Sequence, residues 1–276
     1  MTNRIDVLFA KLRSENRRAL MPFVTAGDPD LATTAMLVAE LASRGAHLIE
    51  IGMPYSDPIA DGPVIAASYH RALERGIKIA HIFQTLRTLR AEGPARFNET
   101  PIVVMVSYAI IHRLGIDRFL NDAATAGLDG LIVPDLPVEE ASPLMEKAVL
   151  RNLDLIQLIT PTTPRERAIQ IAQSTKGFIY YVSVAGTTGE RKALPDELTD
   201  AVAWLRTQTD LPICIGFGIS GPDQVRALAP FADGLIVGSA VVRRLAEALN
   251  RPRVEVVREI GQFMGELGKV LESSHG

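Results

Sequence analysis

The residue best suited to chemistry in this chain is Glu50, a carboxylate inside an apolar run. In a β-strand, alternation places Leu48 and Glu50 on one face and Ile49 and Ile51 on the other. If the isoleucines meet covering helices, Glu50 points into the interior, where partial desolvation raises a carboxyl pKa toward the range used in acid–base catalysis. The alternative is a structural glutamate held by a buried arginine or lysine. We favour a functional role because buried carboxylates are rare without a reason.

Two further carboxylates, Asp57 and Asp61, lie in a long connection over residues 52–63. Asp61 precedes Gly62 and Pro63, so it can cap the next helix. The pair can also bind Mg²⁺, or Asp61 can act in catalysis. The spacing leaves capping and catalysis open. A histidine metal site is not expected, because the five histidines show no recognisable ligand spacing; they are His47, His70, His81, His112 and His275.

Glycines form a third group, at the ends of the last apolar runs. Their backbone N–H groups can approach an anion, and a short helix beginning near Ser239 adds its positive end. Tight turns without a ligand are the alternative. We favour a phosphate site in this group, which comprises Gly189, Gly216-Phe217-Gly218 and Gly238-Ser239-Ala240. Residues 216–221 also match GxGxxG, but no acidic residue ends the following run, so NAD binding is rejected.

The remaining composition narrows the class of protein. The formal net charge is −3 and no basic stretch is dense, so nucleic-acid binding is not expected. No segment approaches 18 apolar residues and the amino terminus lacks a signal-peptide core, so we expect a cytoplasmic protein with no membrane contact. The single cysteine, Cys214, fits a reducing compartment. No lysine ends an apolar run as in a Schiff-base aldolase, so any carbon–carbon cleavage must depend on carboxylates.

The elements that position these residues alternate regularly. Eight short apolar runs, typical of strands covered on both faces, are each followed by helical periodicity. The runs cover residues 19–26, 47–52, 102–107, 130–135, 155–160, 178–184, 212–217 and 234–238. Thr163 followed by Pro164 and Glu166 predicts a capped helix start. Ile5, Leu8, Phe9 and Leu12 predict an extra amino-terminal helix.

We therefore predict an α/β fold, a (β/α)8 TIM barrel over residues 1–276 as one domain, with the extra helix closing its amino-terminal end. An open doubly wound sheet with a second domain is the alternative. The long connections at residues 52–63 and 185–194 leave carboxyl ends of strands, where barrel active sites lie.

Five segments resemble one family, the α subunit of tryptophan synthase. The most specific is residues 50–63 (EIGMPYSDPIADGP). The others are residues 22–29 (PFVTAGDP), 133–137 (VPDLP), 180–189 (YYVSVAGTTG) and 216–219 (GFGI). They occur in the same order and span most of the chain.

The resemblance implies a lyase that cleaves indole-3-glycerol phosphate to indole and glyceraldehyde 3-phosphate. By this resemblance Glu50 is the acid–base residue, and Asp61 accepts a hydrogen bond or proton from the indole N–H. Pocket positions correspond to Phe23, Ile65, Tyr180, Thr188 and Phe217. The partner implied is a β subunit in an α2β2 assembly. That subunit, not this chain, carries pyridoxal phosphate, and Asp57 is a candidate for signalling to it.

The chain departs from the family pattern at Val184, where some members carry arginine, and at Ser107-Tyr108-Ala109. The departure at Val184 puts closure of a lid in doubt. The departure at residues 107–109 puts in doubt how the pocket wall near Met105 is filled. Three other functions are considered. They are a free-standing indole-producing lyase, a barrel that binds a phosphorylated ligand without catalysis, and a metal-dependent phosphosugar epimerase.

Overall fold

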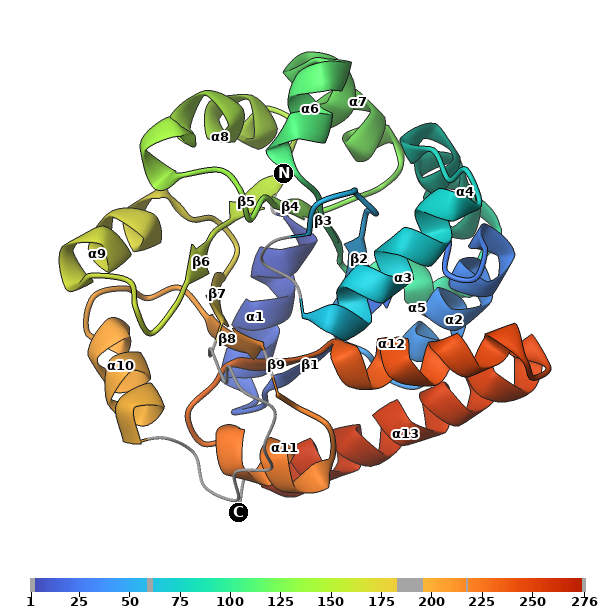
Figure 1. Ribbon diagram of the computed structural model, residues 1–276. Coiled ribbons are helices and arrows are strands. Elements are labelled where there is room, and N and C mark those ends of the chain that lie inside the picture. The colour runs from blue at the N-terminus through green and yellow to red at the C-terminus, as the bar shows by residue number, and fades with distance from the viewer. Residues whose placement is uncertain (1–2, 59–61, 183–195, 217, 275–276) are drawn as a thin grey trace.

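The computed structural model describes residues 3–58, 62–182, 196–216 and 218–274. Its strands lie at the centre of a ring of helices (Figure 1). The strands are β1 (Ala19–Thr25), β2 (Ile49–Gly52), β3 (Ile102–Met105), β4 (Gly130–Ile132), β5 (Asp154–Ile156), β6 (Leu158–Ile159), β7 (Ile179–Val182), β8 (Ile213–Gly216) and β9 (Gly234–Val237). All eight predicted runs therefore contain strand.

Every strand pairing is parallel, in the order β5-β4-β3-β2-β1-β9-β8-β7-β6. Pairing of β1 with β9, in register from Ala19 with Gly234, joins the first and last strands. β5 and β6 end the order, yet only Gln157 separates them in the chain. The cylinder therefore closes, the TIM barrel is confirmed, and the open doubly wound alternative is wrong.

The predicted strand over residues 155–160 is one strand in two halves. Its amino-terminal half, β5, pairs with β4, and its carboxyl-terminal half, β6, pairs with β7. The Gln157 side chain turns to the helical layer, where its Nε2 donates to the Ser174 carbonyl at 2.9 Å. The backbone carbonyl of Gln157 still accepts from the Tyr180 N–H at 3.1 Å, so this residue stays bonded to β7 between the two halves.

Two apolar cores lie on the two faces of the barrel. The outer core contains Ile49 and Ile51 and packs against the helices. The inner core contains Leu48, the residue that directly precedes β2. The same alternation holds on β7, where Tyr180 faces inward and Tyr181 outward. This is the period-two pattern expected of a strand covered on both faces.

The helices are α1 (Arg4–Ser14), α2 (Leu31–Ser43), α3 (Pro63–Glu74), α4 (Ile79–Glu92), α5 (Ala95–Glu99), α6 (Tyr108–Leu114), α7 (Ile116–Thr125), α8 (Ser142–Val149), α9 (Arg165–Ser174), α10 (Asp196–Arg206), α11 (Pro222–Leu228), α12 (Ser239–Leu245) and α13 (Arg253–Ser273), with short 3-10 turns at Val138–Glu140 and Ala246–Leu249.

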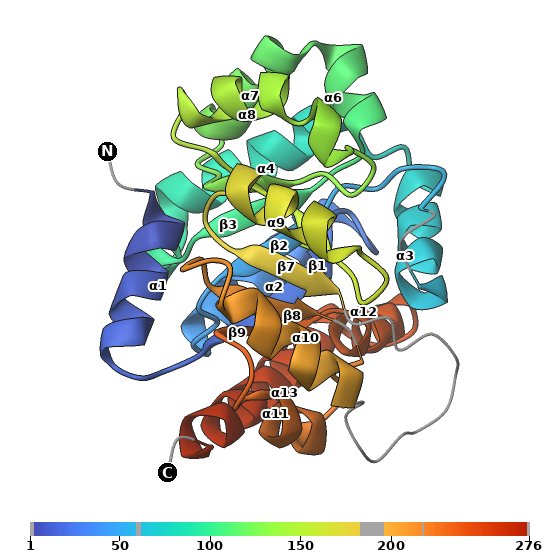
Figure 2. The same ribbon diagram turned by 90° about the vertical axis from the view of Figure 1, so that its left-hand side faces the viewer.

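Helix α1 closes one end of the barrel, as predicted. Its Ile5, Phe9 and Leu12 are buried in the inner core, and the Phe9 ring lies 5.8 Å from that of Phe178. Figure 2 shows α1 and α3 at opposite ends of the molecule. The end of the barrel beside α3 is therefore the one left for the site.

One predicted helix start is wrong. Helix α9 begins at Arg165 with Pro164 in the N-cap position and no side-chain cap. Thr163 instead accepts from the backbone N–H of Thr160 through its Oγ1, at 3.0 Å, and so stabilises the preceding turn. Among the described residues no helix is long and apolar enough to cross a membrane.

Candidate active site

Glu50 is fully buried on the interior face of the barrel. Its neighbours in the parallel register are Phe23 on β1 and Val103 on β3, and both belong to the inner core. The next residue, Ile51, belongs to the outer core. Glu50 is the second residue of the four-residue β2, two residues before the strand ends at Gly52. The geometry thus places a buried carboxylate among apolar side chains inside the barrel, two residues from the strand end at which enzymes of this fold bind their substrates.

Aromatic side chains and Ile65 surround this part of the interior. Phe23, Ile65 and Tyr180 are all buried in the inner core, and they come from β1, α3 and β7. Tyr69, also on α3, is fully buried and stacks at 5.3 Å on the ring of Tyr55 from the connection after β2. Elements distant in sequence therefore supply an apolar lining suited to a planar aromatic ligand.

Two glycines at the ends of strands leave space for these aromatic rings. A Cβ at Gly52 would lie 2.6 Å from the Tyr69 hydroxyl oxygen, with the Phe23 ring also in the way. A Cβ at Gly216 would lie 2.5 Å from Cε1 of Tyr180. Real Cβ atoms do not approach other atoms this closely. The rings therefore occupy space that any other residue would fill.

The residues predicted to bind phosphate lie at the ends of β8 and β9. Gly238 is half-buried, and a Cβ there would be 3.7 Å from Cβ of Phe23. It precedes α12, and its carbonyl accepts from Val241 and Val242 of that helix. Gly218 is exposed, has φ +74°, and has open space where a Cβ would be. Gly238 is thus adjacent to Phe23, the register neighbour of Glu50.

Some predicted residues lie elsewhere. Asp57 is exposed, and its Oδ2 accepts from the Ser56 hydroxyl at 3.1 Å. The N-cap of α3 is Gly62. Asp61, Thr188, Gly189, Phe217 and the variant position Val184 fall outside the described residues. Within the described part of the chain, no three His, Cys, Asp or Glu side chains gather as metal ligands.

Sequence reasoning missed the anchors of α3, the helix that carries Ile65 and follows Asp61. Arg71 donates through Nε and Nη2 to both oxygens of Asp28, at 2.9 and 2.6 Å, and Asp28 is fully buried. This hydrogen bonding raises the pKa of Arg71. The buried hydroxyls of Thr25 and Ser68 lie 2.7 Å apart. Asp28 lies in a quoted family segment, but nothing in its spacing identifies Arg71 as its partner.

A second missed link explains the departure at Ser107-Tyr108-Ala109. The Ser107 hydroxyl donates to Oδ2 of Asp135 at 2.6 Å, and the Tyr108 N–H donates to Oδ1 at 2.7 Å. Ser107 is also the N-cap of α6. The loop after β3 is thereby fixed to the loop after β4. Met105, three residues before Tyr108, is buried in the inner core.

Comparison with known proteins identifies relatives of the whole chain. The family described as "Tryptophan synthase alpha chain" matches residues 9–271. A protein of that name from Rhodopirellula baltica is 51% identical over 98% of this chain and 99% of its own length. One from Caldanaerobacter subterraneus is 43% identical over 98% of this chain and 100% of its own length.

Solved structures are similar over the same extent. The tryptophan synthase alpha chain from Legionella pneumophila subsp. pneumophila has a TM-score of 0.88 at 33% identity, covering 99% of this chain and 98% of its own. A chain of Mycobacterium tuberculosis tryptophan synthase has a TM-score of 0.86 at 32% identity, covering 98% of this chain and 99% of its own.

Proposed function

This chain belongs to the tryptophan synthase alpha chain family, and we propose that Glu50 and Asp61 perform the chemistry of that family here. The chain is a carbon–carbon lyase of tryptophan biosynthesis, and its reaction is the cleavage of indole-3-glycerol phosphate to indole and glyceraldehyde 3-phosphate. The observation that carries our residue assignment is the burial of Glu50 on the inner face of the barrel, next to Phe23.

In the proposed mechanism Glu50 moves protons at both ends of the breaking bond. It donates a proton to C3 of the indole ring and helps remove the proton of the glycerol hydroxyl beside that carbon. The C3–glycerol bond then breaks, its electron pair returns to the ring, and the released fragment becomes an aldehyde. Protonated C3 makes the ring an electron sink, so no lysine Schiff base is needed. Asp61 stabilises the indolenine tautomer by accepting from the ring N–H.

Substrate binding is divided between two ends of the pocket. Phe23, Ile65 and Tyr180, with Thr188 and Phe217, hold the indole by apolar contact. Gly189, Gly218, Gly238 and Ser239 hold the phosphate through backbone N–H groups. The proximity of Gly238 to Phe23 supports this arrangement, because one ligand can then reach both groups.

The family name implies assembly with a β subunit. We propose an α2β2 complex in which the connection containing Asp57 faces the partner, and the exposure of Asp57 supports this role. Pyridoxal phosphate belongs to the β subunit in this proposal, and this chain holds no cofactor. The proposal also includes one domain over residues 1–276, which the family match over residues 9–271 supports. It further includes a cytoplasmic location.

The decisive experiment is turnover by Glu50→Gln and Asp61→Asn. Indole release from indole-3-glycerol phosphate, with chelator present, should fall about 10²–10⁴-fold for Glu50→Gln, the usual contribution of a general acid–base group. Glu146→Gln on the exposed face of α8 is the matched control and should leave turnover unchanged. Unchanged turnover by Glu50→Gln in a folded protein would remove Glu50 from the mechanism.

The partner role is tested with and without the β subunit. We expect weak indole release from the isolated chain and activation on mixing. Asp57→Asn should retain the basal rate and lose part of the activation. Full activity of the isolated chain would instead indicate a free-standing lyase.

A further inference from the structure

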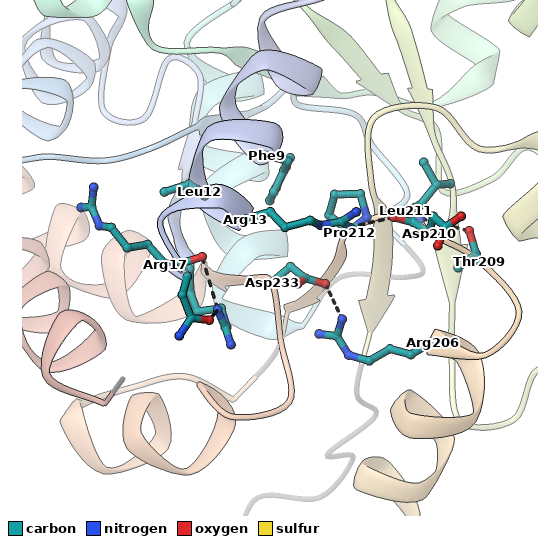
Figure 3. Close-up of a pocket in the computed structure, with 12 residues that line it drawn as sticks. Phe9, Leu12, Arg13, Arg17, Arg206, Thr209, Asp210, Leu211, Pro212 and Asp233 are labelled. Atoms are coloured by element: carbon teal, nitrogen blue, oxygen red, sulfur yellow. Dashed lines mark hydrogen bonds and ion pairs between the residues drawn. The ribbon is translucent and has the colours of Figure 1, made fainter. Parts of the chain in front are cut away.

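A cavity lies at the end of the barrel opposite Glu50. It has a volume of about 460 Å³ and is enclosed by the end of α1, the segment between α10 and β8, and Asp233 before β9. These segments precede strands, whereas the candidate active site follows them. We call it the basal cavity, and Figure 3 shows its lining. Its residues are Phe9, Leu12, Arg13, Asn16, Arg17, Arg18, Arg206, Thr209, Asp210, Leu211, Pro212 and Asp233.

Two of its four arginines are already neutralised. Arg206 forms an ion pair with Asp233 at 3.0 Å (Figure 3). Arg17 contacts Glu15 at 3.0 Å and Glu272 at 2.9 Å, and these hydrogen bonds raise its pKa. Both side chains are therefore held in place and are not available to neutralise a further anion.

The other two arginines have no carboxylate partner among the described residues. Arg13 crosses the cavity to donate through Nη2 to the backbone carbonyl of Asp210, at 2.8 Å. Arg18 makes only long contacts with neutral groups, to Oδ1 of Asn16 at 3.3 Å and to the Arg17 carbonyl at 3.5 Å. A guanidinium binds a carboxylate or phosphate in preference to neutral carbonyls. Both arginines thus have unused binding capacity.

Arg18 also has an unsatisfied donor. Its Nε atom is buried and has no hydrogen-bond acceptor within the described structure. Because almost none of this atom is accessible, a ligand in the cavity would bind the terminal Nη atoms of Arg18 rather than Nε.

We propose that the basal cavity binds the phosphate group of a small metabolite through Arg13 and Arg18. A phosphate monoester carries nearly two negative charges and three acceptor oxygens, so it is a better partner for a guanidinium than the neutral carbonyl groups that these arginines now contact. The volume is in the range of small-ligand sites. This site is separate from the substrate phosphate site at Gly238, which lies at the other end of the barrel.

The carboxylate of Asp210 provides a control for anion binding. Asp210 lines the cavity, is exposed, and has no cationic partner among the described side chains. Its carboxylate repels an anion, so Asp210→Asn should strengthen binding while Arg13→Gln and Arg18→Gln weaken it. Arg13 contacts the backbone carbonyl of Asp210, which this substitution retains.

The test is a titration of the full chain, labelled with ¹⁵N-arginine, with inorganic phosphate against sodium chloride at equal ionic strength. Arginine Nε–H signals report each guanidinium separately, and the single variants assign them. We expect saturable shifts of the Arg13 and Arg18 signals in phosphate only. Arg13→Gln and Arg18→Gln should each weaken binding about fivefold or more, and Asp210→Asn should strengthen it about twofold or more.

Two further variants separate binding from folding. Arg18→Lys keeps the charge but loses the planar guanidinium and its paired Nη donors, so we expect weaker binding with an unchanged circular dichroism spectrum. Arg87→Gln removes an exposed arginine on α4, outside the cavity, and should change affinity less than twofold. Equal shifts in phosphate and chloride, or equal affinities in Asp210→Asn and the parent chain, would overturn the proposal.

Discussion

Asp154→Asn should stabilise this protein, and more so as the pH rises. Asp154 begins β5 at the amino-terminal end of the barrel, where it is 8% exposed. Its Oδ2 has no hydrogen-bond partner among the described residues. Burial, followed by the nearby charges of Asp6 and Asp129, raises its pKa from 3.8 to about 7. Lys176 opposes this rise without cancelling it.

The magnitude follows from proton linkage. Between pH 3.8 and about 7 the folded protein holds the Asp154 proton that the unfolded chain has released. Stability therefore falls as the pH rises through this window and is constant above it. The full rise in pKa corresponds to about 4 kcal/mol, of which about 2–3 kcal/mol lies between pH 5 and pH 8. Asparagine does not titrate, so the variant escapes this loss.

Urea unfolding of both proteins at pH 5, 6, 7 and 8 measures the effect. The advantage of Asp154→Asn in free energy of unfolding should grow by about 2–3 kcal/mol from pH 5 to pH 8. Asp6→Asn removes a neighbouring charge and should give a smaller change of the same sign. Asp200→Asn, exposed on α10, should give none. A difference independent of pH, or one that reverses at pH 8, would refute the assignment.

Three other substitutions test the packing around the site and the outer core. Gly216→Ala forces the Tyr180 ring to move, so kcat/KM for indole-3-glycerol phosphate should fall about tenfold or more; an unchanged value would show that the ring position is unimportant. Arg71→Gln leaves the Asp28 carboxylate buried without its partner, and urea unfolding should show a loss of about 3–5 kcal/mol, partly recovered when Asp28→Asn is added. Tyr181→Phe removes a buried hydroxyl that has no partner in the described structure, so the same assay should show no loss, or a gain of about 1 kcal/mol.

The barrel could be predicted because its information is local. Strands covered on both faces are short apolar runs, and each run found in the sequence contains a strand. The inward orientation of Glu50 was predictable from the alternation of side chains along a strand. Ile49 and Ile51, on either side of it, are in the outer core. The break at Gln157 was not predictable in this way. At this break the Gln157 side chain bonds to Ser174, a partner that only the folded helical layer places nearby.

The links that hold the site were missed for the same physical reason. Asp28 and Arg71 are 43 residues apart, and Ser107 and Asp135 are 28 apart. Neither separation matches a helical or strand period, so the sequence gives no signal for the pairing. At Thr163 a local pattern gave a wrong prediction. The pattern predicted a helix cap, but the Thr163 hydroxyl accepts from the backbone N–H of Thr160 in the preceding turn.

The glycines near the active site divide into two physical classes that the sequence could not separate. Gly52 and Gly216 are buried in strands, and each has an aromatic side chain where its own Cβ would be, Tyr69 in one case and Tyr180 in the other. Gly218 is exposed and has a positive φ with open space beside it, so only its backbone conformation requires glycine. The first class shapes the ring pocket by leaving out side chains, and the second permits a turn whose N–H groups can meet an anion. Glycine therefore has two separate uses at this end of the barrel, since it leaves space for aromatic rings in one position and permits a turn in the other.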